Sequence, residues 1–558
     1  MNVSASLTTI KIKQLLNGWS LFTVITALII ASPVFIVVAY VFVPSGEVWT
    51  HLANTVLPNY ISNSVILLIG VGLGTLIVGT GCAWLVTMCE FPGRKIFEWA
   101  LLLPLAVPAY VIAYTYTGLL DYAGPVQEFL RELFGWRSAR DYWFPEIRTL
   151  WGATTMFTLV LYPYVYMLSR AAFLEQSICV LEVSRTLGRT PWQSFKDVAF
   201  PLARPAIAAG TALALMETLN DFGTVHFFAV DTFTTGIYRT WFGMGEPAAA
   251  AQLGACMLIF IVSLIALERY SRGQAAYHHT TVRYRALRKL QINGIKQILC
   301  LIACILPVFL GFVLPAGILL NWTFATTEWW MTLQFWEFAF NSFILATVAA
   351  LLAVVLAVLM AYGARLQPSL FTKIGVRAAS IGYAVPGSVL AVGIMLPFAW
   401  TDNLIDSWAR EYLGFSTGLI LSGTIVAVVF AYVVRFLSVS YNAIEAGLGK
   451  VTKNMDCAAR TLGHGPGETL RKVHLPLIRA SMFSAGILVF VDVMKELPAT
   501  MIMRPFNFTT LAVRTFELAS DEQLAEASSA ALAIVLVGII PVIMISRTIA
   551  KSRPGHES

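Results

Sequence analysis

Charged residues are scarce in this chain. Asp, Glu, Lys and Arg together make up 12% of its 558 residues, whereas hydrophobic residues make up 58%. The mean hydropathy is +0.73, and a soluble domain of this size does not need so much apolar surface. Apolar runs recur along the chain, each of about 20 residues, which is the length that crosses a bilayer as a helix. The composition therefore predicts an all-α polytopic membrane protein.

Several chemical signatures are also missing. The sequence has no phosphate-binding GxxxxGK[ST] and no catalytic constellation, so we expect no ATP hydrolysis by this chain, no other enzyme activity and no cofactor. Its seven cysteines lack zinc-like spacing and are interpreted as small apolar fillers. The net charge of +7 does not indicate nucleic-acid binding, because the basic residues cluster in short loops. The chain also lacks a long soluble segment that would capture a dilute solute.

The apolar runs predict twelve spans, which are 21–43, 61–88, 97–119, 150–172, 203–222, 250–268, 297–321, 340–364, 376–399, 416–438, 478–499 and 526–546. The first is too long for a signal segment and is expected to remain in place. Basic residues such as Lys11, Arg94 and Lys95 fall on one side of these spans. The other side is acidic or balanced, as in the ninth loop with Asp402 and Asp406. By the positive-inside rule, both termini are predicted to be cytoplasmic.

The two halves of the chain repeat. Matching positions are Asn63 with Asn341, Ser64 with Ser342 and Pro108 with Pro386 at one offset, and Arg185 with Arg460 after a three-residue slip. A tandem duplication of a six-span unit gives two halves of parallel topology. We expect a first unit over 1–268 and a second over 297–558. The basic stretch 269–296 is expected to be a cytoplasmic linker near anionic lipid headgroups.

Two polar, basic stretches stand between spans and match each other. They read LEVSRTLGRTPWQSFKDVAFPLARPAI from Leu181 and CAARTLGHGPGETLRKVHLPLIRASM from Cys457. In the first, Gly188 is expected to end a short helix, because glycine takes a positive φ readily. Pro191 is expected to begin a second helix and Pro201 to stop it. Each stretch, within the cytoplasmic loops 174–202 and 442–477, thus predicts a helical hairpin shaped to enter a groove on a soluble partner.

This pattern resembles the EAA loop of membrane permeases in ATP-binding-cassette (ABC) importers. The residues that carry the resemblance are Glu182, Arg185, Gly188 and Pro201 in the first copy, and Arg460, Gly463 and Pro476 in the second. The resemblance implies two tandem six-helix permease units in a bacterial inner membrane. It also implies two copies of a cytoplasmic ATPase that dock on the hairpins, and a periplasmic substrate-binding protein. The glycines would shape the hairpins, and the two arginines would help to seat them.

Three further segments resemble the ferric-iron importer permeases, which join two permease units in one chain. They are PAYVIAYTYTGLLDYAGPVQ, NDFGT at Asn220–Thr224 and KELPAT at Lys495–Thr500. The resemblance makes ferric iron the expected substrate. Two alternatives stay open. One is a permease for another solute, such as a polyamine, thiamine, phosphonate or oxyanion. The other is a secondary transporter driven by an ion gradient, which would leave the hairpins unexplained.

Acidic residues follow both hairpins at matching positions, Glu217 with Asp492 and Asp221 with Glu496. Acids near span ends are costly unless they face water or a partner. Together they would form an acidic ring lining a cation path, since carboxylate oxygens suit a hard cation. The alternative is local pairing that only holds helices, for instance of Glu496 with Lys495 or of Asp221 with Arg239.

The third predicted span carries tyrosines and ends near an aspartate. Tyr114 and Asp121 are candidates for a phenolate and carboxylate lining for ferric ion, although an aromatic belt at the membrane interface is the favoured explanation of the tyrosines. Pro104, Pro108 and Pro386 lie within predicted spans and are expected to kink them.

Overall fold

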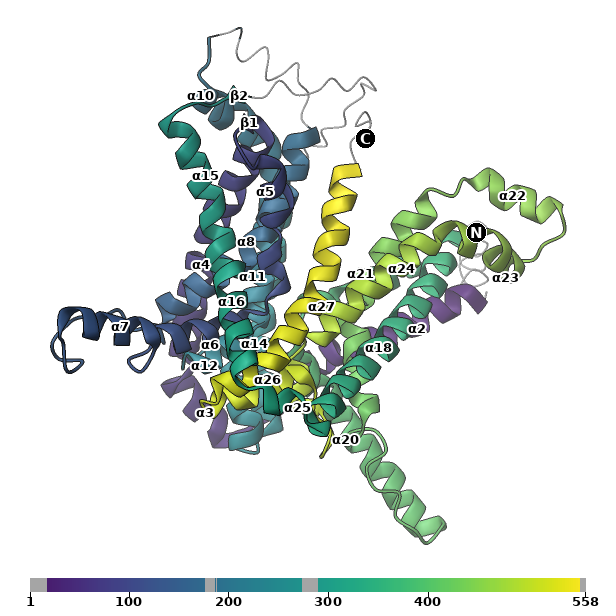
Figure 1. Cartoon of the computed structure of the whole chain (residues 1–558). Coiled ribbons are helices and arrows are strands. Elements are labelled where there is room, and N and C mark those ends of the chain that lie inside the picture. The colour runs from purple at the N-terminus through teal and green to yellow at the C-terminus, as the bar shows by residue number, and fades with distance from the viewer. Residues whose placement is uncertain (1–17, 176–185, 187, 273–289, 552–558) are drawn as a thin grey trace. The chain divides into compact units, whose positions relative to one another are not determined.

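The computed structural model describes residues 18–175, 186, 188–272 and 290–551 (Figure 1). The elements of the first half are α2 (Gly18–Ala39), η1 (Tyr40–Phe42), α3 (Gly46–Thr55), α4 (Leu57–Met88), β1 (Cys89–Glu90), α5 (Arg94–Ala100), η2 (Leu103–Ala106), α6 (Ala109–Leu120), α7 (Pro125–Phe134), α8 (Leu150–Glu175), α10 (Pro191–Ser194), η3 (Phe195–Ala199), α11 (Phe200–Asn220), α12 (Gly223–Phe227), α13 (Phe233–Tyr238), η4 (Arg239–Gly243) and α14 (Pro247–Arg272).

The elements of the second half are β2 (Leu290–Gln291), α15 (Ile295–Val308), η5 (Phe309–Val313), α16 (Leu314–Ala325), α17 (Thr327–Trp330), α18 (Leu333–Leu366), α19 (Leu370–Ala379), η6 (Ser380–Ala384), α20 (Gly387–Tyr412), α21 (Ile425–Gly449), α22 (Lys453–Thr461), α23 (Pro466–Thr469), η7 (Leu470–His474), α24 (Leu475–Met494), α25 (Pro498–Met503), α26 (Leu511–Ser520) and α27 (Leu524–Lys551). The strands β1 and β2 form one short parallel pair. The all-α fold class is confirmed.

Eleven helices among the described residues are long and apolar enough to cross a membrane, and a bent pair gives a twelfth if it is counted as one span. The bent pair joins Arg94–Ala106 to Ala109–Phe134 at 89° and replaces the straight span predicted at 97–119. Pro108 caps the start of α6, and Pro386 caps the start of α20 in the same way. These prolines separate helices, because they lack the N–H that would continue the preceding one. The count of twelve predicted spans agrees with the structure.

The ninth and tenth predicted spans begin too early. The structure places α20 and α21 where the sequence predicts spans at 376–399 and 416–438. Asp402 and Asp406, which the sequence pattern places in a loop, therefore lie in α20. Asp402 is buried and accepts N–H bonds from Leu421 at 2.9 Å and Ser422 at 2.7 Å, so the returning chain is fixed against the helix. The shift arises because α19 and η6, before Pro386, are apolar enough to look like the start of a span.

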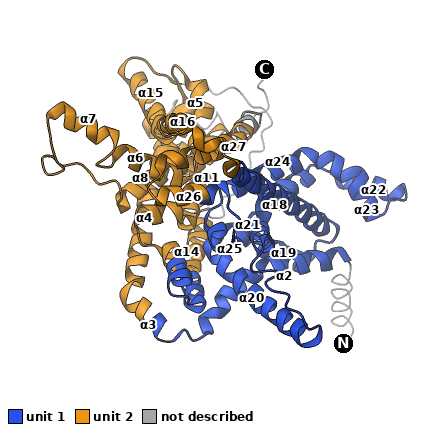
Figure 2. Ribbon diagram, turned by 60° about the horizontal axis from the view of Figure 1, so that its bottom comes forward, with its two compact units in different colours: residues 1–49, 237–256, 336–513 blue, residues 50–236, 257–335, 514–558 orange. Residues whose placement is uncertain are grey.

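The helices form two compact units that do not follow the two halves of the chain (Figure 2). Of the described residues, unit 1 contains 18–49, 237–256 and 336–513, and unit 2 contains the rest. Each unit therefore takes in the opening span of the opposite half. The boundaries 1–268 and 297–558 describe the duplication of the sequence and stay a prediction. The compact units describe how the helices pack, and they divide the chain differently.

In unit 1, the first span α2 packs on second-half helices. The Ser20 hydroxyl donates to Gln367 Oε1 at 2.9 Å, and the rings of Trp19 and Tyr362 lie 5.2 Å apart. In unit 2, the opening spans of the second half pack on first-half helices. The Tyr116 hydroxyl donates to the Leu310 carbonyl at 2.8 Å. The exchange of first spans is thus reciprocal.

The repeat is visible in matching hydrogen bonds within the two units. Asn63 Nδ2 donates to the Asp231 carbonyl at 2.9 Å, and Asn341 Nδ2 donates to the Thr509 carbonyl at 3.2 Å. Asn63 thereby joins the long span α4 to the segment around Asp231, and Asn341 joins the long span α18 to the segment around Thr509. The predicted equivalence of Asn63 and Asn341 is therefore confirmed.

The core of unit 2 depends on close approach between α4 and α8. A Cβ added at Gly79 would lie 2.7 Å from Val165 Cβ and 2.8 Å from the Tyr162 carbonyl oxygen. Tyr162, Val165 and Tyr166 are fully buried beside it. Backbone atoms cannot move aside cheaply, so glycine is required at this position.

We predict that Gly79→Ala destabilises the protein by about 1–3 kcal/mol, because overpacking forces the two helices apart. The measurement is the thermal unfolding midpoint of the purified chain in detergent. Gly81→Ala is the matched control, since a Cβ at Gly81 on the same helix meets nothing within 4 Å. Equal midpoints for the two variants would contradict the prediction.

Candidate coupling hairpins and acidic segments

The second hairpin contains the predicted helix, break and helix. α22 ends at Thr461, and Gly463 follows two residues later with a φ of +83°. The His464 N–H donates to the Ala459 carbonyl and the Gly463 N–H to the Arg460 carbonyl, both at 3.0 Å. This pair of bonds closes a helix end through a left-handed residue, and it favours glycine. The next helix, α23, begins at Pro466.

The tip of this hairpin presents both charge and apolar surface. Arg460 is exposed, and Leu462 beside Gly463 is 76% exposed. The Leu462 side chain was not identified as a site residue by the sequence pattern, although it belongs to the matched Arg-Thr-Leu-Gly segment. An exposed leucine next to a rigid turn suits insertion into an apolar pocket of a partner.

A partly buried polar cluster anchors the second hairpin to α18. Arg365 Nη2 lies 2.9 Å from Asp456 Oδ2, and Asp456 Oδ1 lies 2.7 Å from His474 Nε2. Arg365 also donates to the carbonyls of Leu448 and Val451 at 2.6 and 2.7 Å. Both arms of the hairpin are therefore tied to the end of one span. Sequence reasoning missed this cluster, because its members are far apart along the chain and no motif joins them.

The first hairpin shows the same turn. Gly188 has a φ of +78°, and α10 begins at Pro191 as predicted. The Thr190 N–H donates to Gln193 Oε1 at 2.9 Å, and the Gln193 N–H donates to the Thr190 hydroxyl at 3.3 Å, which caps the new helix. Glu182, Arg185 and the short helix predicted before Gly188 lie outside the described residues.

Pro201 does not stop the second helix of the hairpin, contrary to the prediction. The helical run continues from Trp192 to Asn220. Just before the proline, η3 is a π-helical turn in which the Phe200 N–H bonds the Phe195 carbonyl. The wider turn lets the helix pass a residue that has no N–H. In the second copy η7, also a π-helical turn, precedes Pro476 in the same way, with Leu475 bonded to Leu470. Both Pro201 and Pro476 are exposed.

The acids after the hairpins cap the breaks that end the spans. Asp221 Oδ1 accepts the Thr224 N–H at 2.8 Å at the start of α12. Glu496 accepts the N–H of Ala499 at 3.0 Å and that of Thr500 at 3.1 Å at the start of α25. The predicted equivalence of Asp221 and Glu496 thus holds at the level of single hydrogen bonds.

The two capping acids differ in charge compensation. Glu496 is buried and lies 2.8 Å from Arg435 Nη1 on α21. A Cβ at Gly387 would lie 2.6 Å from the same Glu496 oxygen, so the ion pair needs glycine there. The contacts described for the Asp221 carboxylate are with backbone N–H groups and the Thr224 hydroxyl. The Glu496 carboxylate is therefore paired with a guanidinium, whereas the described contacts of the Asp221 carboxylate include no basic side chain.

The remaining two acids lie one turn before the caps. Asp492 pairs with Lys495 at 3.0 Å. Glu217 is half-buried on α11. Glu217 and Asp221 belong to unit 2, whereas Asp492 and Glu496 belong to unit 1. Their arrangement as one acidic ring stays a prediction.

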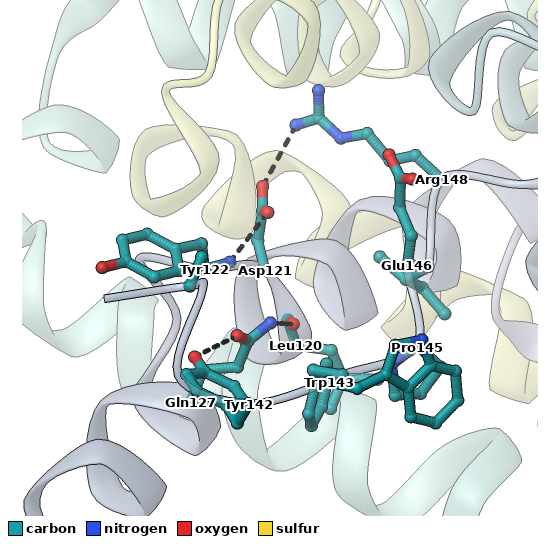
Figure 3. A pocket seen from close by; sticks show the side chains of 12 residues that line it. Leu120, Asp121, Tyr122, Gln127, Tyr142, Trp143, Pro145, Glu146 and Arg148 are labelled. Atoms are coloured by element: carbon teal, nitrogen blue, oxygen red, sulfur yellow. Dashed lines mark hydrogen bonds and ion pairs between the residues drawn. The ribbon is translucent and has the colours of Figure 1, made fainter. Parts of the chain in front are cut away.

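Tyr114 and Asp121 are not brought together. Tyr114 is fully buried on α6, and its hydroxyl has no hydrogen-bond partner within the described part of the chain. Asp121 lines a pocket of about 350 Å³ beyond the end of α6, together with Tyr122, Gln127 and Arg148 (Figure 3). Arg148 Nη2 lies 3.7 Å from Asp121 Oδ2. Their joint role as ferric ligands stays a prediction.

One side of the pocket is lined by a loop with its own fixed turn. The Asp141 carboxylate accepts the N–H groups of Arg137 and Ser138, each at 2.8 Å. These donors lower the pKa of Asp141 below its usual value. Among the residues that the structure describes, no three His, Cys, Asp or Glu side chains are grouped to hold a metal ion.

The fold and these sites define a helical, polytopic membrane protein with two repeated hairpins. A model of the family described as "Binding-protein-dependent transport system inner membrane component" matches residues 75–272 and again 353–554, together more than half of the chain. The chain therefore belongs to this family, as two tandem permease units of an ABC importer in the inner membrane. The family is a non-catalytic part of a transport system, and its description implies a binding protein and an ATPase as partners.

Several relatives are similar over long stretches. The Fe(3+)-transport system permease protein FbpB 2 of Haemophilus influenzae is 28% identical over 87% of this chain and 89% of that protein. The ferric transport system permease protein FbpB of Actinobacillus pleuropneumoniae is 25% identical over 79% of this chain and 64% of that protein. The molybdenum transport system permease protein ModB of Escherichia coli (strain K12) is 27% identical over 35% of this chain and 83% of that protein.

We predict that Arg435→Met lowers the free energy of unfolding by about 3–5 kcal/mol, because it leaves the buried Glu496 carboxylate without its cation. The double variant Arg435→Met/Glu496→Gln should recover part of the loss, since a neutral amide needs no charge partner. The measurement is the unfolding midpoint in detergent.

The control for this prediction is Arg410→Ala. The Arg410 side chain is 65% exposed, and its partner Asp406 keeps N–H donors from Thr417 and Gly418. The midpoint of this variant should not change measurably. A midpoint for Arg435→Met equal to that of Arg410→Ala would show that the buried pair is not needed.

Proposed function

We propose that this chain is the permease of a ferric iron importer. The observation that carries the proposal is the similarity to a relative named for Fe(3+) transport, which extends over 87% of the chain and 89% of that relative. The ferric relatives match both halves of the chain in one alignment, whereas the molybdenum relative matches a segment of about a third of it. A fused two-unit permease for ferric iron accounts for the similarity along both halves of the chain.

In this proposal the two hairpins receive two copies of a cytoplasmic ATPase. Gly188 and Gly463 give each hairpin a fixed left-handed turn. Leu462, Arg460 and the 69% exposed Trp192 offer side chains to the ATPase surface. The ties of Arg365 to Asp456 and to two carbonyls would pass a displacement of the second hairpin on to α18. ATP-driven closure would then rock the six-span units between inward-open and outward-open states.

The proposed path uses the acids unequally. Asp492 and Glu496 have Lys495 and Arg435 as ion partners, which reduces their pull on a cation. The described contacts of the Asp221 carboxylate are with neutral donors, so none of them is a basic side chain that would compete with a passing cation. We therefore assign the leading role in the path to Asp221, with Glu217 one turn away. A periplasmic binding protein would deliver the ion, and both termini would be cytoplasmic, as the basic loops indicate.

We predict that the double variant Gly188→Val/Gly463→Val loses most of its coupled ATPase activity and co-purifies with less ATPase. A β-branched residue is strained at a positive φ, so the hairpin turn would be distorted. Gly465→Val is the control, because Gly465 has an ordinary φ of −71° and open space around it. Full coupling in the double variant would count against the role of the hairpins.

The proposal is tested by reconstituting the chain in liposomes with its ATPase and binding protein. ATP hydrolysis is followed as ferric-loaded, empty, molybdate-loaded and polyamine-loaded binding proteins are added in turn. We expect stimulation by the ferric-loaded form alone. In the same vesicles, Asp221→Asn should reduce ferric uptake while it keeps the cap, since an amide oxygen also accepts N–H bonds.

Stimulation by the molybdate-loaded protein alone would keep the family and replace iron by an oxyanion. Normal ferric uptake by Asp221→Asn would remove Asp221 from the path without affecting the substrate assignment. Uptake driven by an ion gradient without ATP would contradict the importer mechanism itself.

A further inference from the structure

α7 is an amphipathic helix whose polar face is turned toward the protein. Gln127 is 8% exposed, and its Nε2 donates to the Leu120 carbonyl at 2.8 Å. Arg131 Nη1 donates to the Tyr122 carbonyl at 2.7 Å, and the Tyr142 hydroxyl donates to Gln127 Oε1 at 2.6 Å. These contacts fix the rotation of α7 about its own axis.

The apolar face of α7 consequently points away from the protein. Phe129, Leu133 and Phe134 are 62%, 62% and 59% exposed. Phe129 and Leu133 are four positions apart and lie on one side of the helix, and Phe134 extends this apolar surface from the position next to Leu133. A soluble surface helix has the opposite arrangement, with its apolar side inward. The inversion shows that α7 is built for apolar surroundings.

The place of α7 in the chain sets its depth relative to the bilayer. It follows α6 and precedes α8, and α8 then crosses to the side of the first hairpin. In Figure 1, α7 leaves unit 2 sideways, at a steep angle to α8 and α15. In Figure 2, turned from that view, it again projects outward from the unit. α7 thus lies away from the end of unit 2 that carries the first hairpin, marked by α10 in Figure 1.

Two exposed tryptophans lie in the part of the chain that follows α7. Trp151, in the first turn of α8, is 70% exposed, and Trp143 in the preceding loop is 86% exposed. Tryptophan is enriched at membrane–water interfaces, because its ring is apolar and its N–H is polar. The spans of unit 2 leave similar apolar side chains uncovered, such as Ile69 at 58% and Ile77 at 67% on α4. The exposed face of α7 therefore matches the lipid-facing surface of its own unit.

We propose that α7 is an interfacial helix that lies along the bilayer surface, with Phe129, Leu133 and Phe134 inserted among the lipids. Glu128, on the opposite side of the helix, then faces water. α7 carries two acids and one arginine, so its binding relies on apolar burial and not on attraction to anionic headgroups. It would hold the polar loop and pocket that follow it at a fixed height above the membrane.

Lipid suits this face better than a soluble partner does. A partner that comes and goes would leave three large apolar side chains in water for part of the time, and such patches favour aggregation. Lipid is always present beside a span. The proposal does not depend on the transported substrate, since it rests on the spans and on α7 alone.

The test is photo-cross-linking from the full chain in its reconstituted complex. The photoreactive residue p-benzoylphenylalanine replaces Phe129 or Phe134, and Glu128 in the control. All three positions are exposed, so the substitutions are not expected to disturb folding. After illumination in phosphatidylcholine liposomes, mass spectrometry measures the fraction of chain bound to phospholipid. We expect several-fold more lipid adduct from positions 129 and 134 than from 128.

The yield should stay the same when phosphatidylglycerol replaces part of the phosphatidylcholine, because anionic lipid is not required. Two outcomes would overturn the proposal. One is an equal lipid adduct from all three positions. The other is preferential cross-linking of positions 129 and 134 to the added binding protein, which would make α7 a protein-docking surface.

Discussion

The capping of broken spans by buried carboxylates is the interaction on which this structure depends. In a membrane protein, backbone N–H groups at a helix break have no water to bond and must be satisfied internally. Asp221 does this at the start of α12 and Glu496 at the start of α25. A carboxylate is well suited to the task, since it accepts several N–H bonds at once. Asp221, the acid given the leading role in the proposed cation path, is thus also a group that the fold itself requires.

The two capping acids, one in each half of the chain, differ in their charge partners. Glu496 is neutralised by Arg435, and Gly387 leaves room for that pair. The position of Gly387 corresponds to Ala109 in the first half, at the offset that relates Pro108 to Pro386. A duplicated permease has thus become asymmetric while it keeps the backbone geometry of its repeat. One half holds its acid in a rigid ion pair, and the other keeps a carboxylate bonded to neutral donors.

The reciprocal exchange of first spans makes the two halves depend on each other for folding. α2 packs in unit 1 with second-half helices, and α15 and α16 pack in unit 2 with first-half helices. Neither half alone could bury its own opening span in this way. The hairpins are in turn joined to long helices, as Arg365 joins the second hairpin to α18. Motion at a hairpin therefore acts on a packed unit and not on a single loop.

Local sequence determined the number of spans, the repeat, the hairpin turns at Gly188 and Gly463, and the family. These features follow from apolar run length, from proline and glycine chemistry and from short motifs, all of which act over a few residues. Tertiary structure alone decided that Pro201 is absorbed by a π-helical turn and that Arg435 reaches Glu496 across 61 positions. It also decided which half receives each first span and that the polar face of α7 turns inward. Such outcomes depend on which side chains meet after distant helices pack, and helix periodicity carries no information about that choice.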